Sequence, residues 1–316
     1  MQAVAYEVFG DASVLAVRDV PEPSPGRGEV QVRVCVASLN PVDFKLRRGM
    51  LRLVGRPRRP AITGKDFAGV ITRLGGDVQG YAVGQRVFGS VDPLGGRGSC
   101  AEFVCLATDL IAPTPTAISD VVAASLPVAA GTALQCLTDI AGLRRDQSIL
   151  VTGASGAVGS AAVQIARSIG ARITGVCATA NIEYVRSIGA RQIVDYKTAD
   201  WSGIDQLFDV VFDAAAVGSF AMARARLGPA GIYINTMPRP GLFWDALMAR
   251  IGSRQRCVPF LLKTNSAQLR RLGQLAVDDI LVPRIDAVVD LSAVAAEQRR
   301  MEEGGVHGKV CVRVSE

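Results

Sequence analysis

The chain contains a single histidine, His307, and none of its seven cysteines belongs to a Cys-x-x-Cys pair. A structural zinc site needs four protein ligands, and a catalytic zinc site usually needs three, in recognisable clusters. The sequence offers no such cluster and therefore predicts no metal site. We expect the dispersed cysteines to be reduced and mostly buried rather than paired in disulfides.

Long apolar runs are absent as well, since no stretch approaches the ~18 uninterrupted apolar residues of a membrane span. The first residues, Met1–Glu7, have no basic segment ahead of an apolar core and reach an acidic residue early, which is not the pattern of a signal peptide. The sequence therefore predicts a cytoplasmic protein without a membrane partner.

Aromatic residues make up only 5% of the chain, and none lies between Phe44 and Phe67, where the arginines are densest. The net charge of +6 raises the question of a nucleic-acid partner. An arginine cluster without aromatic side chains has no platform on which bases could stack, so we interpret it as a solvated loop. The cluster consists of Arg47, Arg48, Arg52, Arg56, Arg58 and Arg59.

Glycine, by contrast, is plentiful, and one glycine-rich turn organises the chain. The apolar run Ile149–Thr152 predicts a buried strand that leads directly into the turn Gly153–Gly159. Apolar residues then recur at helical spacing up to Ile169, and Gly170 has the place of a left-handed C-cap. Arg172–Ala178 predicts the next strand. The pattern is that of a βαβ crossover of ~30 residues.

The glycines of this turn have separate roles in a dinucleotide-binding site. Gly153 permits the tight turn, Gly156 lets the backbone approach a pyrophosphate, and Gly159 lets the helix pack closely on the sheet. The helix N-terminus then offers free amide groups and the positive end of its dipole to a phosphate. The residues predicted to bind a dinucleotide here are Gly153, Ser155, Gly156, Ala157, Val158 and Gly159.

The chain divides into two kinds of sequence. Many short strands separated by Gly/Pro turns precede residue 120 and predict a compact β-barrel-like domain, to which residues 255–316 return. From 121 to 254, after an Ala-rich helical segment broken at Pro127, strands and helices alternate and predict a doubly wound parallel sheet. We expect a turn at Gly228–Gly231, with Ile232–Asn235 as the last strand of that sheet.

Several further motifs occur in a fixed order along nearly the whole chain. They are Pro25–Val30, Leu39–Lys45, Gly64–Val70, Gly98–Val104, Ala124–Ala129, Val194–Lys197 and Gly308–Val310. Together with the glycine turn, they resemble the medium-chain dehydrogenase/reductase superfamily, and within it the zinc-free quinone oxidoreductase (zeta-crystallin-like) branch. The resemblance implies an α/β fold with a Rossmann domain and a GroES-like β-barrel catalytic domain.

The branch follows from the residues at the zinc positions. Zinc alcohol dehydrogenases of this superfamily carry a cysteine ligand where this chain has Asn40, and Gly-His-Glu where it has Gly64–Asp66. Amide and ammonium groups do not form that zinc site, so no metal would polarise a substrate carbonyl. The resemblance therefore implies hydride transfer to a quinone or to the β-carbon of an α,β-unsaturated carbonyl, rather than alcohol oxidation.

The sequence favours NADPH as the cofactor. NAD sites usually carry an acidic residue at the end of the second strand, about 20 residues after the glycine turn, and Cys177–Asn181 contains none. We expect Thr179 to donate to a 2′-phosphate and Tyr196 to pack near it, as a matching tyrosine does in relatives. Helix capping by Thr179 and an ordinary strand position for Tyr196 stay open. Thr236 is expected at a strand end on the nicotinamide side.

Two residues are candidates for catalysis. Lys45 stands where the zeta-crystallin type carries a tyrosine near the nicotinamide, and it could position the cofactor or stabilise developing enolate charge. Its alternative is an ordinary surface lysine. Asn40 is expected to hydrogen-bond to cofactor or substrate, with capping of the turn before Pro41 as its alternative. Phe243 and Trp244 are expected to form an apolar substrate wall or a dimer contact.

A homodimer is also predicted, because Ile232–Asn235 would be an uncovered edge strand and the family typically joins two sheets near this position. Two other functions stay open. An enoyl thioester reductase would use the same hydride step, with the arginine cluster receiving a phosphopantetheine. A non-enzymatic NADPH- or RNA-binding protein of the crystallin type is allowed by the isoelectric point near 9.1.

Overall fold

The computed structural model describes residues 1–51, 59–92, 97–237, 241, 245, 249 and 254–315. It consists of two compact units. The first unit comprises Met1–Gly131 with Thr264–Glu316, and the second unit comprises Thr132–Lys263. Among the described residues, the helices are all too short or too polar to cross a membrane.

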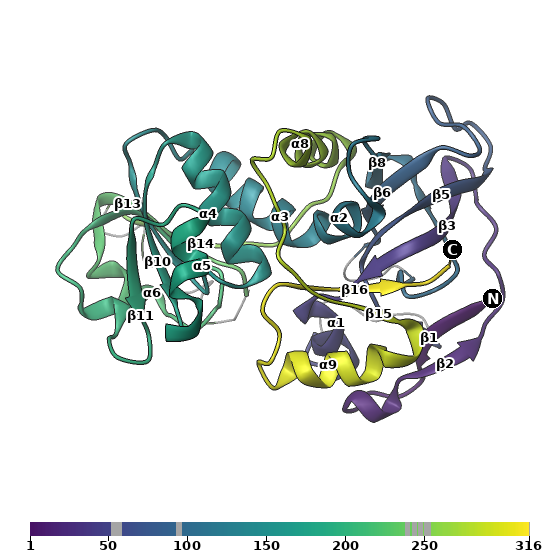
Figure 1. The fold of residues 1–316 in the computed structure, drawn as a ribbon, viewed down its shortest axis with the longest axis horizontal. Helices are drawn as coiled ribbons and strands as arrows, with labels where there is room; N and C mark the ends of the chain where they lie inside the picture. The colour runs from purple at the N-terminus through teal and green to yellow at the C-terminus, as the bar shows by residue number, and fades with distance from the viewer. Residues whose placement is uncertain are drawn as a thin grey trace. The chain divides into compact units, whose positions relative to one another are not determined.

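The first unit is built mainly of antiparallel strands (Figure 1). A small sheet has the order β2-β1-β4, and a larger one has the order β15-β16-β3-β5-β6-β8, with β7 paired to β3. Their bounds are β1 (Gln2–Tyr6), β2 (Ala16–Asp19), β3 (Glu29–Ser38), β4 (Ala61–Ile62), β5 (Asp66–Leu74), β6 (Arg86–Ser90), β7 (Phe103–Ala107), β8 (Ile111–Pro113), β15 (Ile285–Asp290) and β16 (Lys309–Arg313).

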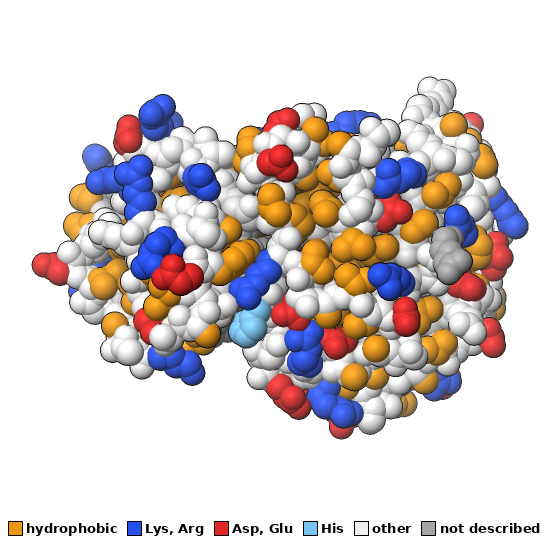
Figure 2. All heavy atoms as spheres, in the orientation of Figure 1, with side chains coloured by type: hydrophobic (Ala, Val, Ile, Leu, Met, Phe, Trp, Pro, Cys, Tyr) orange, Lys and Arg blue, Asp and Glu red, His pale blue; other side chains and the backbone are white. Residues whose placement is uncertain are grey.

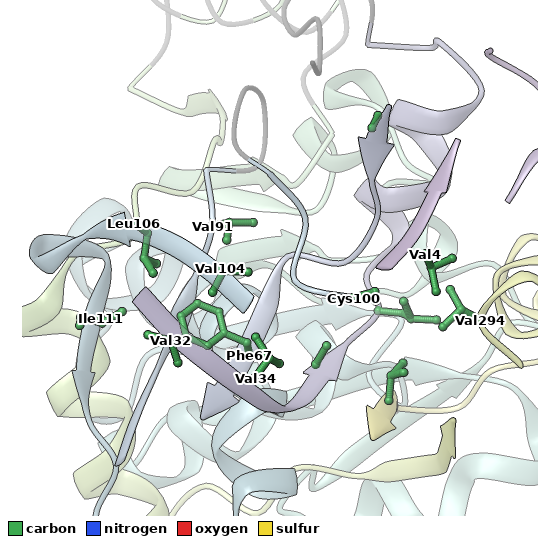
Figure 3. Packing of buried hydrophobic residues seen from close by; sticks show 14 of the residues in the cluster. Val4, Val32, Val34, Phe67, Val91, Cys100, Val104, Leu106, Ile111 and Val294 are labelled. Atoms are coloured by element: carbon green, nitrogen blue, oxygen red, sulfur yellow. The ribbon is translucent and has the colours of Figure 1, made fainter. Parts of the chain in front are cut away.

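The core of this unit lies between these strands. Alternation in β3 buries Val32 and Val34 completely, as the period of two predicts, and Phe67 of β5 packs with them (Figure 3). Val104 and Ile111 complete this part of the cluster from β7 and β8. Each such side chain contributes about 1.5–3 kcal/mol on burial, so a slip of one residue that exposed these side chains would be costly.

Two helices pack against the strands of the first unit (Figure 1): α2 (Asp120–Ser125) lies against β3 and β5, and α8 (Ser266–Val277) lies against β8. Helix α1 (Pro41–Arg47) packs against α9 (Val294–Glu302), and α3 (Pro127–Leu134) begins in the first unit and ends in the second. The helical segment breaks at Pro127, where α3 begins, as expected. Because α2 packs on the strands of the first unit, the unit extends to Gly131 rather than ending at residue 120.

The second unit is a parallel sheet with helices. Its strand order is β11-β10-β9-β12-β13-β14, which is the order of a doubly wound dinucleotide-binding fold. The strands are β9 (Ser148–Thr152), β10 (Arg172–Cys177), β11 (Gln192–Asp195), β12 (Phe208–Asp213), β13 (Leu227–Asn235) and β14 (Arg256–Pro259). The helices packed on them include α4 (Ala157–Ile169), α5 (Ile182–Ser187) and α6 (Phe220–Arg224).

Two expectations about the end of this sheet are wrong. Gly228–Gly231 is not a separate turn, because β13 runs through it with a register shift against β12. Ile232–Asn235 is not an edge, because β14 pairs in parallel with it. Pairing with β13 also keeps Arg256–Pro259 in the second unit, past the boundary expected at residue 254. The homodimer stays a prediction, and its edge-strand argument now applies to β14.

Candidate dinucleotide site and buried ion cluster

The glycine turn of the second unit has the geometry of a dinucleotide cradle. Gly153 has a φ of +60°, a conformation that side chains rarely adopt. A Cβ on Gly159 would lie 2.1 Å from the carbonyl oxygen of Gly153, so only glycine allows this close packing. A Cβ on Gly156 would meet nothing closer than that same oxygen at 3.4 Å. The space above Gly156 is therefore open to a ligand.

The start of α4 supplies donors at this opening. Gly156 is the N-cap, so the amide groups of Ala157 and Val158 lie in the first turn and have no acceptor within the helix. Ser155 to Val158 are all partly exposed, and Gly170 closes the helix in the left-handed conformation, with a φ of 86°. Free amides, the positive end of the helix dipole and the open space together fit a pyrophosphate.

A buried carboxylate supports the strand ends beside the cradle. Asp213, at the end of β12, accepts from the Thr152 hydroxyl at 2.5 Å, the Tyr233 hydroxyl at 2.8 Å and the Asn235 amide at 2.9 Å. The Thr236 hydroxyl, predicted to face the nicotinamide, lies 3.3 Å from the carbonyl oxygen of Ala214. Thr236 thus stands at a strand end, as expected, and Asp213 holds that end in place. The sequence analysis did not identify Asp213.

The ribose end of the site contains an acid that the sequence analysis did not count. The Thr179 hydroxyl donates to Asp195 at 2.5 Å, and the backbone amide of Lys197 donates to the other carboxylate oxygen at 2.9 Å. The Thr179 hydrogen bond is the main cause that lowers the pKa of Asp195. Tyr196 is 55% exposed, and the Lys197 ammonium lies 5.4 Å from its ring centroid. Asn181, not Thr179, is the N-cap of α5.

The first unit contains a buried ion pair. The Lys309 ammonium lies 3.0 Å from the carboxylate of Asp66, and both side chains are almost fully buried. Lys309 also donates to Asn40 Oδ1 at 2.8 Å, and Asn40 Nδ2 donates to Asp66 Oδ2 at 3.0 Å. The backbone amide of Val128 donates to the other carboxylate oxygen at 3.1 Å. Asn40 therefore uses both ends of its amide group inside the protein, and its predicted hydrogen bond to cofactor or substrate stays a prediction.

A second pair of ionisable groups lies next to this cluster. Asp43 accepts from the backbone amides of Asn40 at 2.7 Å and Gly64 at 3.1 Å, and burial raises the pKa of Asp43 to about 6. Burial lowers the pKa of Lys65, and the nearby charge of Asp43 opposes that shift. The residues that stand at the family's zinc positions thus form interactions of their own.

Lys45 lies in the second turn of α1 and is partly buried. Burial lowers the pKa of its ammonium group, and the nitrogen lies 6.0 Å from the centroid of the Phe44 ring. A lysine whose charged form is made less favourable by burial is a better proton donor than one in water. Lys45 is thus partly buried, and its role in catalysis stays a prediction.

The arginine cluster is not a uniformly solvated loop. Arg47 is fully buried, where it donates to Gln298 at 2.9 Å and forms an ion pair with Glu302. Arg59 lies over the ring of Phe9, 4.2 Å from its centroid. These two arginines are bound within the first unit, which opposes the phosphopantetheine site. Five residues named from the sequence lie outside the described residues: Arg52, Arg56, Arg58, Phe243 and Trp244.

The charges on one face of the described residues are mixed (Figure 2). On the face shown in Figure 2, Lys and Arg side chains are scattered among acidic and apolar ones, and the histidine is exposed. The described residues contain no group of three or more His, Cys, Asp or Glu side chains that could hold a metal ion. All seven cysteines are free, and five of them are buried, as expected.

Known proteins share this architecture over the whole chain. Residues 26–116 match the model of the alcohol dehydrogenase GroES-like domain, and residues 188–312 match that of the zinc-binding dehydrogenase. A chloroplast envelope quinone oxidoreductase homolog of Arabidopsis thaliana is 34% identical, with 99% of this chain and 98% of the relative covered. The chain belongs to the medium-chain dehydrogenase/reductase superfamily.

Two more similar proteins are named as oxidoreductases. An NADPH-dependent alkenal/one oxidoreductase of Arabidopsis thaliana, named as chloroplastic, is 33% identical over 68% of this chain and 57% of its own length. The solved quinone oxidoreductase from Coxiella burnetii is 28% identical and superimposes with a TM-score of 0.90, covering 100% of this chain and 99% of the other. The predicted family and fold class are confirmed, and the protein is an oxidoreductase of the nicotinamide-dependent type.

The cytoplasmic location predicted from the sequence is wrong on this comparison. Three relatives matched over 99% of this chain are named as chloroplast proteins. The prediction was based on the composition of the first residues. That composition does not show the compartment of this protein, because members of the superfamily occupy different compartments.

Proposed function

We propose that the protein is a reductase that transfers hydride from a nicotinamide cofactor to a quinone or to the β-carbon of an α,β-unsaturated carbonyl. The observation that carries the proposal is the cradle formed by Gly153, Gly156 and the N-terminus of α4, in a chain whose relatives include named quinone and alkenal/one oxidoreductases. Such acceptors already have an electron-poor carbon, so they need less polarisation than a simple carbonyl.

The cofactor we propose is NADPH. The segment between β10 and α5 has no acidic residue, and one relative is named as NADPH-dependent. When bound, the reduced nicotinamide supplies the hydride. The amides of Ala157 and Val158 would hold the pyrophosphate, because they are donors at the positive end of a helix dipole. Thr236, at the end of β13, would lie on the nicotinamide side of the cofactor.

Lys45 is the residue that we propose acts on the acceptor. Hydride addition to an enone or quinone places negative charge on the acceptor oxygen, and a nearby ammonium group stabilises that charge and can deliver a proton to it. Lys45 suits this role because burial lowers the pKa of its ammonium. Asn40, Asp66 and Lys309 would position the start of α1 and therefore Lys45.

Lys45→Ala is expected to lower kcat by about 10- to 100-fold while changing the dissociation constant of NADPH less than threefold. The reason is that charge on the acceptor oxygen develops mainly in the transition state, so loss of the ammonium affects kcat more than binding. Lys45→Arg, which keeps a cation at this position, should recover part of the rate. Steady-state kinetics and titration of NADPH measure the two quantities. An unchanged kcat in Lys45→Ala would remove Lys45 from the reaction.

We propose further that the activity is independent of zinc. Asn40 and Lys65 occupy ligand positions of the zinc enzymes, and Asn40 is already bound to Lys309 and Asp66. We therefore expect full activity after treatment with a zinc chelator and no gain on addition of zinc. Activity lost to the chelator and restored by zinc would contradict the proposal.

The acceptor class is tested by one panel of quinones, enones and enoyl thioesters, read as the loss of reduced nicotinamide absorbance. We expect quinones or enones to be reduced with kcat/KM values at least ~10⁴ M⁻¹s⁻¹, the lower end of ordinary enzymes. Preferred reduction of thioesters would replace this proposal with the enoyl thioester hypothesis. No turnover of any acceptor, despite cofactor binding, would favour a non-enzymatic role.

A further inference from the structure

A carboxylate lies where the sequence suggested that none was present. Strands β10 and β11 are parallel, and their register pairs Cys177 with Asp195. Val176 of β10 pairs in turn with Thr152 of β9, the last residue before the glycine turn. The carboxyl ends of the three strands therefore meet at one edge of the sheet, where this fold binds the ribose of a dinucleotide. Asp195 comes from the third strand, yet it lies beside the end of the second.

The Thr179 hydroxyl and the Asp195 carboxylate offer a ligand acceptors rather than donors. The single hydroxyl proton of Thr179 is committed to Asp195, at 2.5 Å, so the hydroxyl oxygen can only accept further bonds. The carboxylate receives the Thr179 hydroxyl on one oxygen and the Lys197 amide on the other, and the Thr179 backbone amide is a third donor to it, so one of its four lone-pair sites remains for a ligand. The ribose 2′-hydroxyl of NADH is a donor, whereas the 2′-phosphate of NADPH is an acceptor with up to two negative charges.

We infer that Asp195 sets the ratio of NADPH to NADH binding in this protein, by accepting from the 2′-hydroxyl of NADH and repelling the 2′-phosphate of NADPH. The inference rests on the proposed function only in that a nicotinamide dinucleotide binds at the glycine turn. Lys197, on the same turn, brings a positive charge close to Asp195. This charge offsets part of the repulsion between Asp195 and the 2′-phosphate, so that NADPH can still bind. The preference for NADPH is thus weaker than the absence of an acid from β10 would give.

Two fragments test the inference without the nicotinamide. Adenosine 2′,5′-bisphosphate carries the 2′-phosphate of NADPH, and adenosine 5′-monophosphate carries the free 2′-hydroxyl of NADH. We expect Asp195→Asn to shift the ratio of their dissociation constants, measured by calorimetric titration, by about tenfold in favour of the bisphosphate. The same variant should shift the ratio for intact NADPH and NADH in the same direction.

Asp200→Asn is the matched control. Asp200 is exposed whereas Asp195 is partly exposed, and like Asp195 it accepts from a neighbouring hydroxyl and amide, those of Ser202 at 2.8 and 2.9 Å. The control changes the net charge equally, so its fragment ratio should stay within twofold of that of the unmodified protein. An equal shift in both variants would mean that only the overall charge matters, and would overturn the role of Asp195.

Thr179→Val separates the two assignments of Thr179. If the carboxylate dominates, the variant keeps Asp195 and should bind the bisphosphate as well as the unmodified protein or better. If Thr179 instead donates to the 2′-phosphate, its affinity for the bisphosphate should fall severalfold, which would contradict the inference. A constant fragment ratio in Asp195→Asn, with both fragments and NADPH still bound, would overturn the inference alone. Failure of the unmodified protein to bind either dinucleotide would overturn it together with the proposed function.

Discussion

Gly156→Asp is expected to abolish dinucleotide binding and turnover while leaving the fold intact. A Cβ at this position meets only the Gly153 oxygen at 3.4 Å, and its φ of −77° suits any residue. Aspartate is moreover a favoured N-cap, so its carboxylate should accept from the first-turn amides of α4 and stabilise the helix. Those are the donors that a pyrophosphate needs. The introduced carboxylate thus takes up the donors of the cradle, and its negative charge repels the pyrophosphate.

The expected magnitude is a loss of ~100-fold or more in NADPH affinity, with a melting temperature unchanged or slightly raised. Gly156→Asn is the matched control, because asparagine has the same shape and capping ability without the charge. It should weaken binding less than aspartate does. Calorimetric titration and thermal unfolding measure the two properties. Binding of NADPH to Gly156→Asp within threefold of the unmodified protein would show that the cradle is not the dinucleotide site.

Lys309→Met is expected to lower the free energy of unfolding of the first unit by about 3–5 kcal/mol. The substitution leaves the carboxylate of Asp66 buried without its cation, with hydrogen bonds only from neutral donors such as Asn40 and the Val128 amide. Desolvation of an unpaired charge is far more costly than loss of an exposed pair. Asn40 also loses the partner of its Oδ1, so the start of α1 should become less ordered.

Two comparison variants and the choice of readout make the result specific. The double variant Asp66→Asn/Lys309→Met removes both charges and should recover much of the lost stability. Arg18→Met breaks the exposed pair with Glu7 and should cost less than ~1 kcal/mol. Both tryptophans, Trp201 and Trp244, belong to the second unit, so hydrogen exchange at β5 and β16 is the suitable readout. A cost of Lys309→Met as small as that of Arg18→Met would contradict the prediction.

The sequence by itself determined the elements whose causes are local. The glycine turn, the helix that ends at Gly170 and the break at Pro127 all follow from backbone preferences and the spacing of apolar residues within a few turns. Motifs in family order then gave the superfamily and the fold class, because they mark positions with fixed backbone geometry.

The tertiary structure alone decided which side chains meet. Asp66 and Lys309 are 243 residues apart, and Arg47 and Glu302 are 255 apart, so no local pattern could pair them or show that Arg47 is buried. Asp195 was passed over because the expected acid belongs to β10, and only the parallel register of β10 and β11 brings it to the ribose position. Likewise, only the structure shows that β14 pairs with Ile232–Asn235, which the sequence had predicted to be the edge strand. Pairing between strands that are distant in the sequence depends on the packed sheet as a whole. Strand β14 has only four residues, and so short a segment has too little periodicity for the sequence to predict it as a strand.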